Sequence, residues 1–187
     1  MKALLISVHP QWVELILNFI KKDEIRKGTD IGKAINRLIK LQGIAPTFIY
    51  CTKGKPNIAK NNETKTGLLD LNGKVVARFN ATAEEITPFE EYESPFGMAY
   101  KLTKDKIVCC QKAQLTYDEY NNYLQGKKGT AIHINDLEIF DKPKEISEFK
   151  HLVKYWKCID EPYSHYACVE ELVPLTRAPE SYCYIEI

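Results

Sequence analysis

Short β-rich segments, separated by few regular helices, constrain the fold of this chain most strongly. They span residues 3–8, 24–27, 46–52, 73–82, 131–140 and 182–187, and residues 107–110 read as a further short strand. Because parallel strands need helical crossovers between them, this pattern favours an antiparallel or mixed barrel over a doubly wound sheet. We therefore expect an α+β chain whose strands join one sheet system.

Three helices are predicted between these strands. The first follows Pro10, which is tolerated at a first helical position because its missing N–H would be unpaired anyway; its wide apolar face predicts burial. Residues 31–42 repeat apolar side chains at three- and four-residue spacing. Thr116 and Glu119 match a capping box, which predicts a helix over 117–124. We expect irregular structure over 83–105, which is acidic, and near 150–175, which is aromatic-rich.

The composition fits one globular domain and excludes several other classes. Of the 187 residues, 44% are hydrophobic and 27% are charged, so neither a disordered chain nor a collagen-like repeat fits. Lys and Arg number 26 against 25 Asp and Glu, and the net charge of +1 excludes a uniformly basic surface of the kind that coats nucleic acid. No apolar run approaches the ~18 residues of a membrane span. We expect a monomeric cytoplasmic protein whose six cysteines stay reduced.

The charge is distributed unevenly along the chain. Residues 1–60 hold 11 Lys and Arg against 4 Asp and Glu, whereas residues 61–187 hold 15 against 21. This asymmetry indicates an anionic partner for the first third of the chain. The alternative is that folding brings the two parts together and cancels the field.

The segment after Pro10 resembles the signature of the ASCH family. That family has a β-barrel related to the PUA RNA-binding domain, and its hallmark is a helix that ends in GxKxxExR. Lys21, Glu24 and Arg26 match this motif, and Phe19 stands in place of the glycine. That glycine usually allows the turn from helix to strand.

Three later segments, 49–56, 132–143 and 175–185, also resemble ASCH proteins of phages and prophages of Gram-positive bacteria. The resemblance therefore implies that residues 1–187 form a single ASCH domain. The helix near 30–43 looks like an insertion relative to the family pattern.

Lys21, Glu24 and Arg26 flank one predicted corner between helix and strand. Glu24 and Arg26 point to the same face of a strand, because side chains alternate with period two. In a cleft, the arginine fork suits a phosphate or a base edge, Glu24 accepts from an amine, and Lys21 supplies a charge or a reactive amine. The alternative is a surface ion pair of little energetic value.

Further candidate ligand-binding residues lie in the later segments. Thr52 ends a predicted strand, and Lys53 and Lys55 follow it on either side of Gly54. This arrangement suits the binding of a phosphate, and the alternative is an ordinary basic loop. The remaining candidates are Asn135, which shares a strand face with His133, and Arg177 and Ser181, which bracket Pro179 before the last strand.

The cysteines and histidines give little support for a metal or a cofactor. Cys158, His165 and Cys168 suggest zinc, but a structural zinc site needs four ligands, usually in closely spaced pairs. We expect no metal and no other cofactor.

Two function classes remain open. In the first, the chain binds RNA, a nucleotide or a modified nucleoside through Lys21, Glu24 and Arg26. In the second, it is an enzyme, because one ASCH branch hydrolyses acetylated cytidine with Lys, Thr and Glu. Here Lys21 matches, Glu24 stands at the threonine position, and residues 111–115 contain no carboxylate. The resemblance also raises ribonuclease activity, but no pair of histidines suited to acid–base cleavage is evident.

Overall fold

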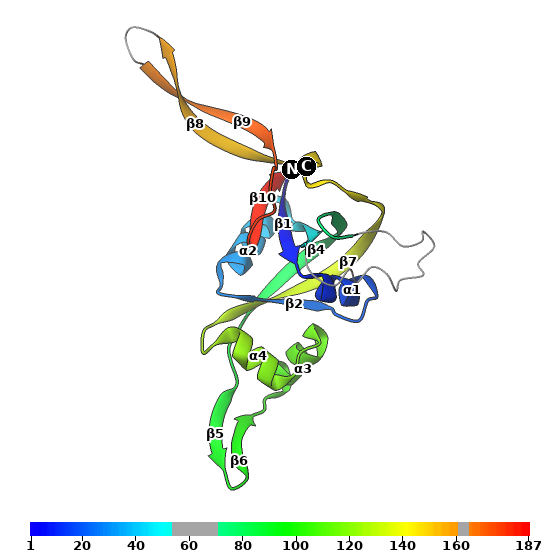
Figure 1. Ribbon diagram of the computed structural model, residues 1–187. Helices are drawn as coiled ribbons and strands as arrows, with labels where there is room; N and C mark the ends of the chain where they lie inside the picture. Colours follow the sequence, from blue (N-terminus) through cyan, green and yellow to red (C-terminus); the bar gives the residue numbers. More distant parts are fainter. Residues whose placement is uncertain (54–70, 161–164) are drawn as a thin grey trace.

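The computed structural model describes residues 1–53, 71–160 and 165–187 (Figure 1). Four α-helices, one short 3₁₀ helix and ten strands occur in the described part of the chain. In chain order they are β1 (Lys2–Val8), α1 (Pro10–Leu17), β2 (Asp23–Lys27), α2 (Asp30–Gln42), β3 (Pro46–Cys51), β4 (Val75–Ile86), β5 (Glu90–Ser94), β6 (Gly97–Lys101), α3 (Lys104–Ala113), α4 (Tyr117–Leu124), β7 (Gly129–Lys144), η2 (Ile146–Glu148), β8 (Lys150–Asp160), β9 (His165–Pro174) and β10 (Tyr182–Glu186).

Eight of the strands form one mixed sheet in the order β2-β7-β4-β3-β1-β10-β8-β9. β1 and β3 are parallel, whereas the other neighbouring pairs in the sheet are antiparallel. All six β-rich segments of the sequence pattern belong to this sheet. The expected α+β class and the shared sheet are therefore confirmed.

The sheet is open, which differs from the closed barrel expected from the sequence. β2 and β9 stand at its two ends, and in the described residues they are not paired with each other. β8 meets β10 at one register pair, Lys150 with Glu186, and then pairs with β9 in a ribbon that leaves the body (Figure 1). Because these last two strands leave the sheet together, they do not bridge back to β2.

Helices cover the sheet through separate apolar clusters. α1 and α2 pack against β1, β3, β4 and β7, with Ile16 and Ile35 fully buried. α3 and α4 pack against Ile25 of β2 and Ala131 of β7. A third cluster lies on the opposite face of β1 and contains Leu5, because successive side chains of a strand point to opposite faces.

The predicted strand at 107–110 is wrong, because these residues lie in helix α3. Cys109, Cys110 and Ala113 are buried, and their three- and four-residue spacing is that of one helix face. A run of four apolar residues is too short to distinguish a buried strand from a buried helix segment. The capping box is confirmed, since the Glu119 backbone N–H donates to Thr116 Oγ1 at 3.2 Å and the Thr116 N–H donates to Glu119 Oε2 at 2.8 Å.

The two segments expected to be irregular form hairpins instead. Within 83–105, β5 and β6 pair with each other in a separate sheet, and within 150–175, β8 and β9 form the long ribbon. The two hairpins project from opposite ends of the molecule (Figure 1). Two-stranded hairpins bury little on either face, so their sequences lack the strict alternation that marks a half-buried strand.

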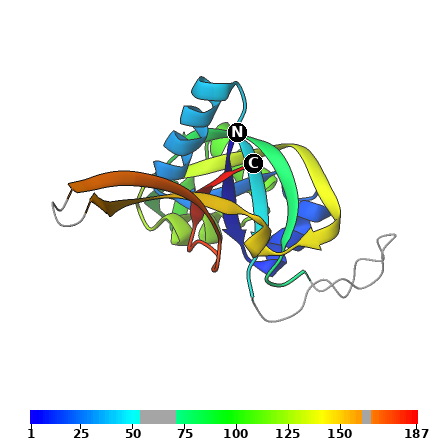
Figure 2. The same ribbon diagram turned by 90° about the horizontal axis from the view of Figure 1, so that it is seen from above.

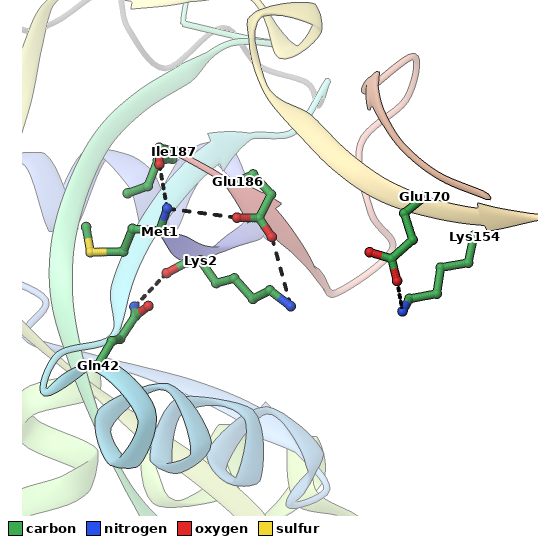
Figure 3. A network of polar contacts seen from close by, with 7 residues as sticks. All are labelled: Met1, Lys2, Gln42, Lys154, Glu170, Glu186 and Ile187. Carbon is green, nitrogen blue, oxygen red and sulfur yellow. Dashed lines mark hydrogen bonds and ion pairs between the residues drawn. The ribbon is translucent and has the colours of Figure 1, made fainter. Parts of the chain in front are cut away.

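α2 lies across the sheet, and its C-terminal end is fixed by local contacts. At its end, Gly43 adopts the left-handed conformation, with a φ of 83°. Gln42 Nε2 donates to the Lys2 carbonyl of β1 at 2.7 Å (Figure 3). Viewed from above, α2 stands on one side of the sheet, and the β8–β9 ribbon extends past it (Figure 2). Within the described residues, no helix has the length and apolar character needed to cross a membrane.

Candidate functional site

The turn between α1 and β2 places Lys21 and Glu24 at the start of the site. Phe19 adopts a left-handed conformation with a φ of 59°. Its N–H donates to the Ile16 carbonyl at 2.9 Å, and the Ile20 N–H donates to the Leu15 carbonyl at 2.9 Å. This is the Schellman arrangement, whose left-handed position is usually glycine. Phe19 thus takes the backbone conformation for which the motif's glycine is suited.

Lys21, Glu24 and Arg26 form a buried ion cluster. Lys21 Nζ lies 3.6 Å from Glu24 Oε2, and Arg26 Nη2 lies 3.1 Å from Glu24 Oε1. The three side chains are 2%, 8% and 12% exposed, respectively. Each oxygen of the Glu24 carboxylate therefore faces one cation, and this fixes its orientation.

Two backbone carbonyls hold the cations of this cluster. Lys21 Nζ donates to the Ala113 carbonyl at the end of α3, at 2.6 Å, where the negative end of the helix dipole favours a cation. Arg26 Nη2 donates to the Ser7 carbonyl of β1 at 2.5 Å, whereas Arg26 Nε is buried without a hydrogen-bond partner among the described residues. Burial lowers the pKa of Lys21, and attraction to Glu24 opposes that effect.

The ion cluster lines a cavity of about 790 Å³, within the ~300–1,000 Å³ range of small-molecule sites. Trp12 and Tyr123 supply aromatic surface, and Lys21 Nζ lies 4.7 Å from the centre of the Trp12 ring. Three cations and three carboxylates line the cavity, so their formal charges cancel. The complete lining is Ser7, His9, Trp12, Lys21, Glu24, Ile25, Arg26, Lys27, Thr52, Leu115, Glu119, Asn122, Tyr123, Glu180 and Ser181.

The structure brings five of the nine sequence-predicted site residues together at this cavity: Lys21, Glu24, Arg26, Thr52 and Ser181. Thr52 Oγ1 lies 3.3 Å from His9 Nδ1, and Ser181 accepts a bond from the Ser7 N–H through its carbonyl.

Three other predicted residues lie on exposed surface outside this cavity. They are Lys53, Asn135 and Arg177. Asn135 Nδ2 donates to Thr82 Oγ1 at 3.2 Å. Lys55 falls outside the described residues. A second cavity, of about 650 Å³ beside Phe48 and Phe149, contains none of the nine.

Sequence reasoning missed the side of the cavity that α4 supplies. Glu119, Asn122 and Tyr123 line the cavity about 100 positions after Lys21, and no local pattern links the two segments. Trp12 lies on the helix whose apolar face predicted burial, but it is half-buried and also lines the cavity. The segments around Lys21, Thr52 and Ser181 carried recognisable signals of a site, and α4 carried none.

His133 and Asp23 form a second polar contact on β7 and β2. His133 Nδ1 lies 2.9 Å from Asp23 Oδ1, and the hydrogen bond to this buried carboxylate raises the pKa of His133. The side chain of His133 is half-buried. Neither residue lines the cavity.

A zinc site at Cys158, His165 and Cys168 stays an untested idea. The side chains of Cys158 and His165 lie outside the part that the structure describes. Elsewhere in the described part, no three His, Cys, Asp or Glu side chains are grouped so that they could hold a metal ion.

Comparison with known proteins yields structural similarity only. No family model and no curated protein matches the chain. Two solved structures that resemble it are both of ASCH proteins, and both come from Zymomonas mobilis. One is the structure of a point variant of the Zymomonas mobilis ASCH protein. It is 16% identical to this chain, with a TM-score of 0.46, and the match covers 78% of this chain and 77% of the variant. The ASCH structure without that substitution is 17% identical, with a TM-score of 0.44, over 77% of this chain and 73% of its own. Membership of the ASCH family stays a prediction.

Proposed function

We propose that this chain is an ASCH-type protein with a PUA-like fold, of the phage and prophage kind, whose cavity binds RNA, a nucleotide or a modified nucleoside. One observation carries the proposal: Lys21, Glu24 and Arg26, the residues of the family motif, meet at a cavity that also contains aromatic surface. Buried charges are expensive unless they are paired, and such clusters occur preferentially at functional sites.

The lining of the cavity suits a nucleobase with an attached sugar. Trp12 and Tyr123 offer surfaces on which a base stacks, as single-stranded RNA recognition commonly requires. The balanced charge of the lining suits a base edge with both donors and acceptors better than it suits a polyphosphate. Hydroxyl groups at Thr52 and Ser181 add donors and acceptors at the rim.

Arg26 is the residue that we expect to contact the ligand most specifically. Both of its observed contacts, to Glu24 and to the Ser7 carbonyl, use Nη2, and the guanidinium carries five N–H donors in all. Glu24 and Ser7 therefore orient the fork while other donors remain for a base edge or a phosphate.

A binding titration with single-stranded RNA and with nucleotides tests the proposal. Arg26→Ala should weaken binding by roughly 1–3 kcal/mol, the range for loss of a bidentate contact. Lys53→Ala, an exposed residue outside the cavity, should weaken binding less, and its effect should shrink as salt rises. The proposal fails if wild-type protein binds neither RNA nor nucleotides at low salt.

Hydrolysis of an acylated nucleoside is the second candidate, because burial lowers the pKa of Lys21 and so favours a basic or nucleophilic amine. Two observations weigh against it. Glu24 stands where the hydrolases have threonine, and the nearby Glu119 carboxylate accepts from the Thr116 N–H and hydroxyl. Enzyme activity predicts that Lys21→Met abolishes deacylation of acetylcytidine while nucleoside binding survives. Absence of turnover by the wild-type protein excludes it.

A further inference from the structure

α2 presents a stripe of positive charge to solvent. Lys33, Arg37 and Lys40 are exposed and follow one another at four- and three-residue spacing, so they share one face of the helix. The opposite face buries Ile31 and Ile35 against the sheet. The basic stripe, which we define as Lys33, Arg37 and Lys40, therefore points away from the sheet.

Two of the three cations in the basic stripe have no carboxylate at ion-pair distance among the described residues. Lys33 Nζ lies 3.2 Å from Asp30 Oδ1, an exposed pair, and Arg37 and Lys40 form no such pair. Some other exposed basic residues are paired, such as Arg78 with Glu138. Lys2, near the end of α2, is also paired, with Glu186 at 4.0 Å (Figure 3). The basic stripe accounts for part of the positive charge in the first third of the chain.

The face that carries the basic stripe begins beside the cavity. β2 ends with Arg26 and Lys27, both lining residues, and α2 starts at Asp30. On the other side, Ser181 lines the cavity and Tyr182, the next residue, packs against the apolar cluster beneath α2. A polymer that leaves the cavity on this side therefore meets α2 first.

β10 adds an aromatic side chain on the side of the sheet that α2 covers. Tyr184 pairs with Leu4 across the β1–β10 ladder, and directly opposite residues in such a ladder point to one face. Leu4 belongs to the cluster beneath α2, so Tyr184 lies on the α2 side of the sheet, where it is 38% exposed. Exposed aromatic rings and cations on one side of a protein are the groups that bind single-stranded nucleic acid.

The opposite end of the molecule is unsuited to an anionic polymer. The β5–β6 hairpin holds Glu90, Glu91 and Glu93 against one basic residue, Lys101. The carboxylates of this hairpin repel a nucleic-acid strand, whereas the basic stripe attracts one.

We propose that the basic stripe and Tyr184 bind the backbone and one base of single-stranded RNA that continues out of the cavity. This inference deepens the proposed function and rests on it, since it names a polymer of several nucleotides as the ligand. Lys33 and Lys40 are seven residues apart, about 10 Å along the helix, which matches roughly three nucleotides at the ~3.4 Å rise of a stacked strand.

The test compares a long and a short probe on three variants. The probes are fluorescently labelled oligouridine of twelve nucleotides and of two nucleotides. Arg37→Ala/Lys40→Ala removes two charges of the basic stripe, Arg26→Ala alters the cavity, and Lys104→Ala/Lys142→Ala is the control. The control removes two exposed lysines, from α3 and β7, so its net charge equals that of the stripe variant.

The stripe variant should bind the twelve-nucleotide probe about tenfold or more weakly at ~50 mM salt. The slope of log affinity against log salt concentration should become shallower by about 1.4, or ~0.7 for each lost phosphate contact. Its affinity for the two-nucleotide probe and that of the control variant for both probes should stay within about twofold of wild type. Equal losses in the stripe and control variants overturn the inference. If the stripe variant loses affinity but Arg26→Ala does not, the stripe binds RNA and the cavity proposal is wrong. If wild-type protein binds neither probe, both proposals fail.

Discussion

Removal of the negative charge at Glu24 should destabilise the fold strongly. Glu24→Gln leaves Lys21 and Arg26, both largely buried, without the carboxylate that lies 3.6 Å and 3.1 Å from them. Breaking a buried ion cluster by removal of one partner costs about 3–5 kcal/mol, because the remaining charge stays desolvated. The exposed pair of Glu90 and Lys101 gives a matched control, and Glu90→Gln should change the free energy of unfolding by no more than about 1 kcal/mol.

Urea unfolding of wild type and both variants measures these free energies. The loss in Glu24→Gln should depend on pH in a defined direction. Because the pKa of Lys21 is lowered in the folded state, the unfolded chain binds more protons, and stability rises as the pH rises toward the ordinary lysine value of 10.5. Without Glu24 the pKa of Lys21 falls further, so part of the loss at pH 7 should be recovered at high pH. A loss below about 1 kcal/mol at pH 7 refutes the description of a buried, mutually dependent ion cluster.

Three further outcomes follow from the local structure. Phe19→Gly should be more stable in urea than Phe19→Ala by about 1 kcal/mol, since both variants remove the 62% exposed ring and only glycine avoids the left-handed strain; equal stabilities contradict this. The raised pKa of His133 implies a contribution to folding stability that is present below its ordinary pKa of about 6.5 and is lost as the pH rises through the folded-state value. His133→Gln should therefore remove this dependence of the free energy of unfolding on pH. An unchanged pH profile of unfolding in that variant argues against the pair with Asp23. Thr116→Ala should lower the thermal midpoint and cost about 1 kcal/mol through loss of the capping bond to Glu119, and an unaltered midpoint would contradict that role.

Local patterns predicted the regular elements well where one face of an element is buried. The apolar spacing of residues 31–42 predicted α2, and the capping box at Thr116 predicted α4, because both depend on interactions within a few residues. The chain's β-rich segments likewise predicted the strands of the main sheet. Helix α3 was missed because residues 107–110 are uniformly apolar and do not reveal a period.

The site could be predicted only on the side where its residues are close in sequence. Lys21, Glu24 and Arg26 follow one another across a single turn, and the alternation of β2 places Glu24 and Arg26 on one face. The other wall, with Glu119 and Tyr123 on α4, depends on the packing of α3 and α4 against β2 and β7. Whether a sheet closes also depends on such distant contacts, so the pattern of strands predicted a barrel where the sheet is open.

Fluorescence of Trp12 tests the central claim, ligand binding in the cavity, most directly. The chain has two tryptophans, and Trp156 on β8 is 71% exposed, so Trp156→Phe leaves Trp12 as the single reporter at the cavity. Titration with twelve-nucleotide oligouridine and with the four ribonucleoside monophosphates should give a saturable change for at least one probe. Addition of Arg26→Ala should weaken that binding by roughly 1–3 kcal/mol. No change with any probe, or the same curve with and without Arg26, would contradict the claim.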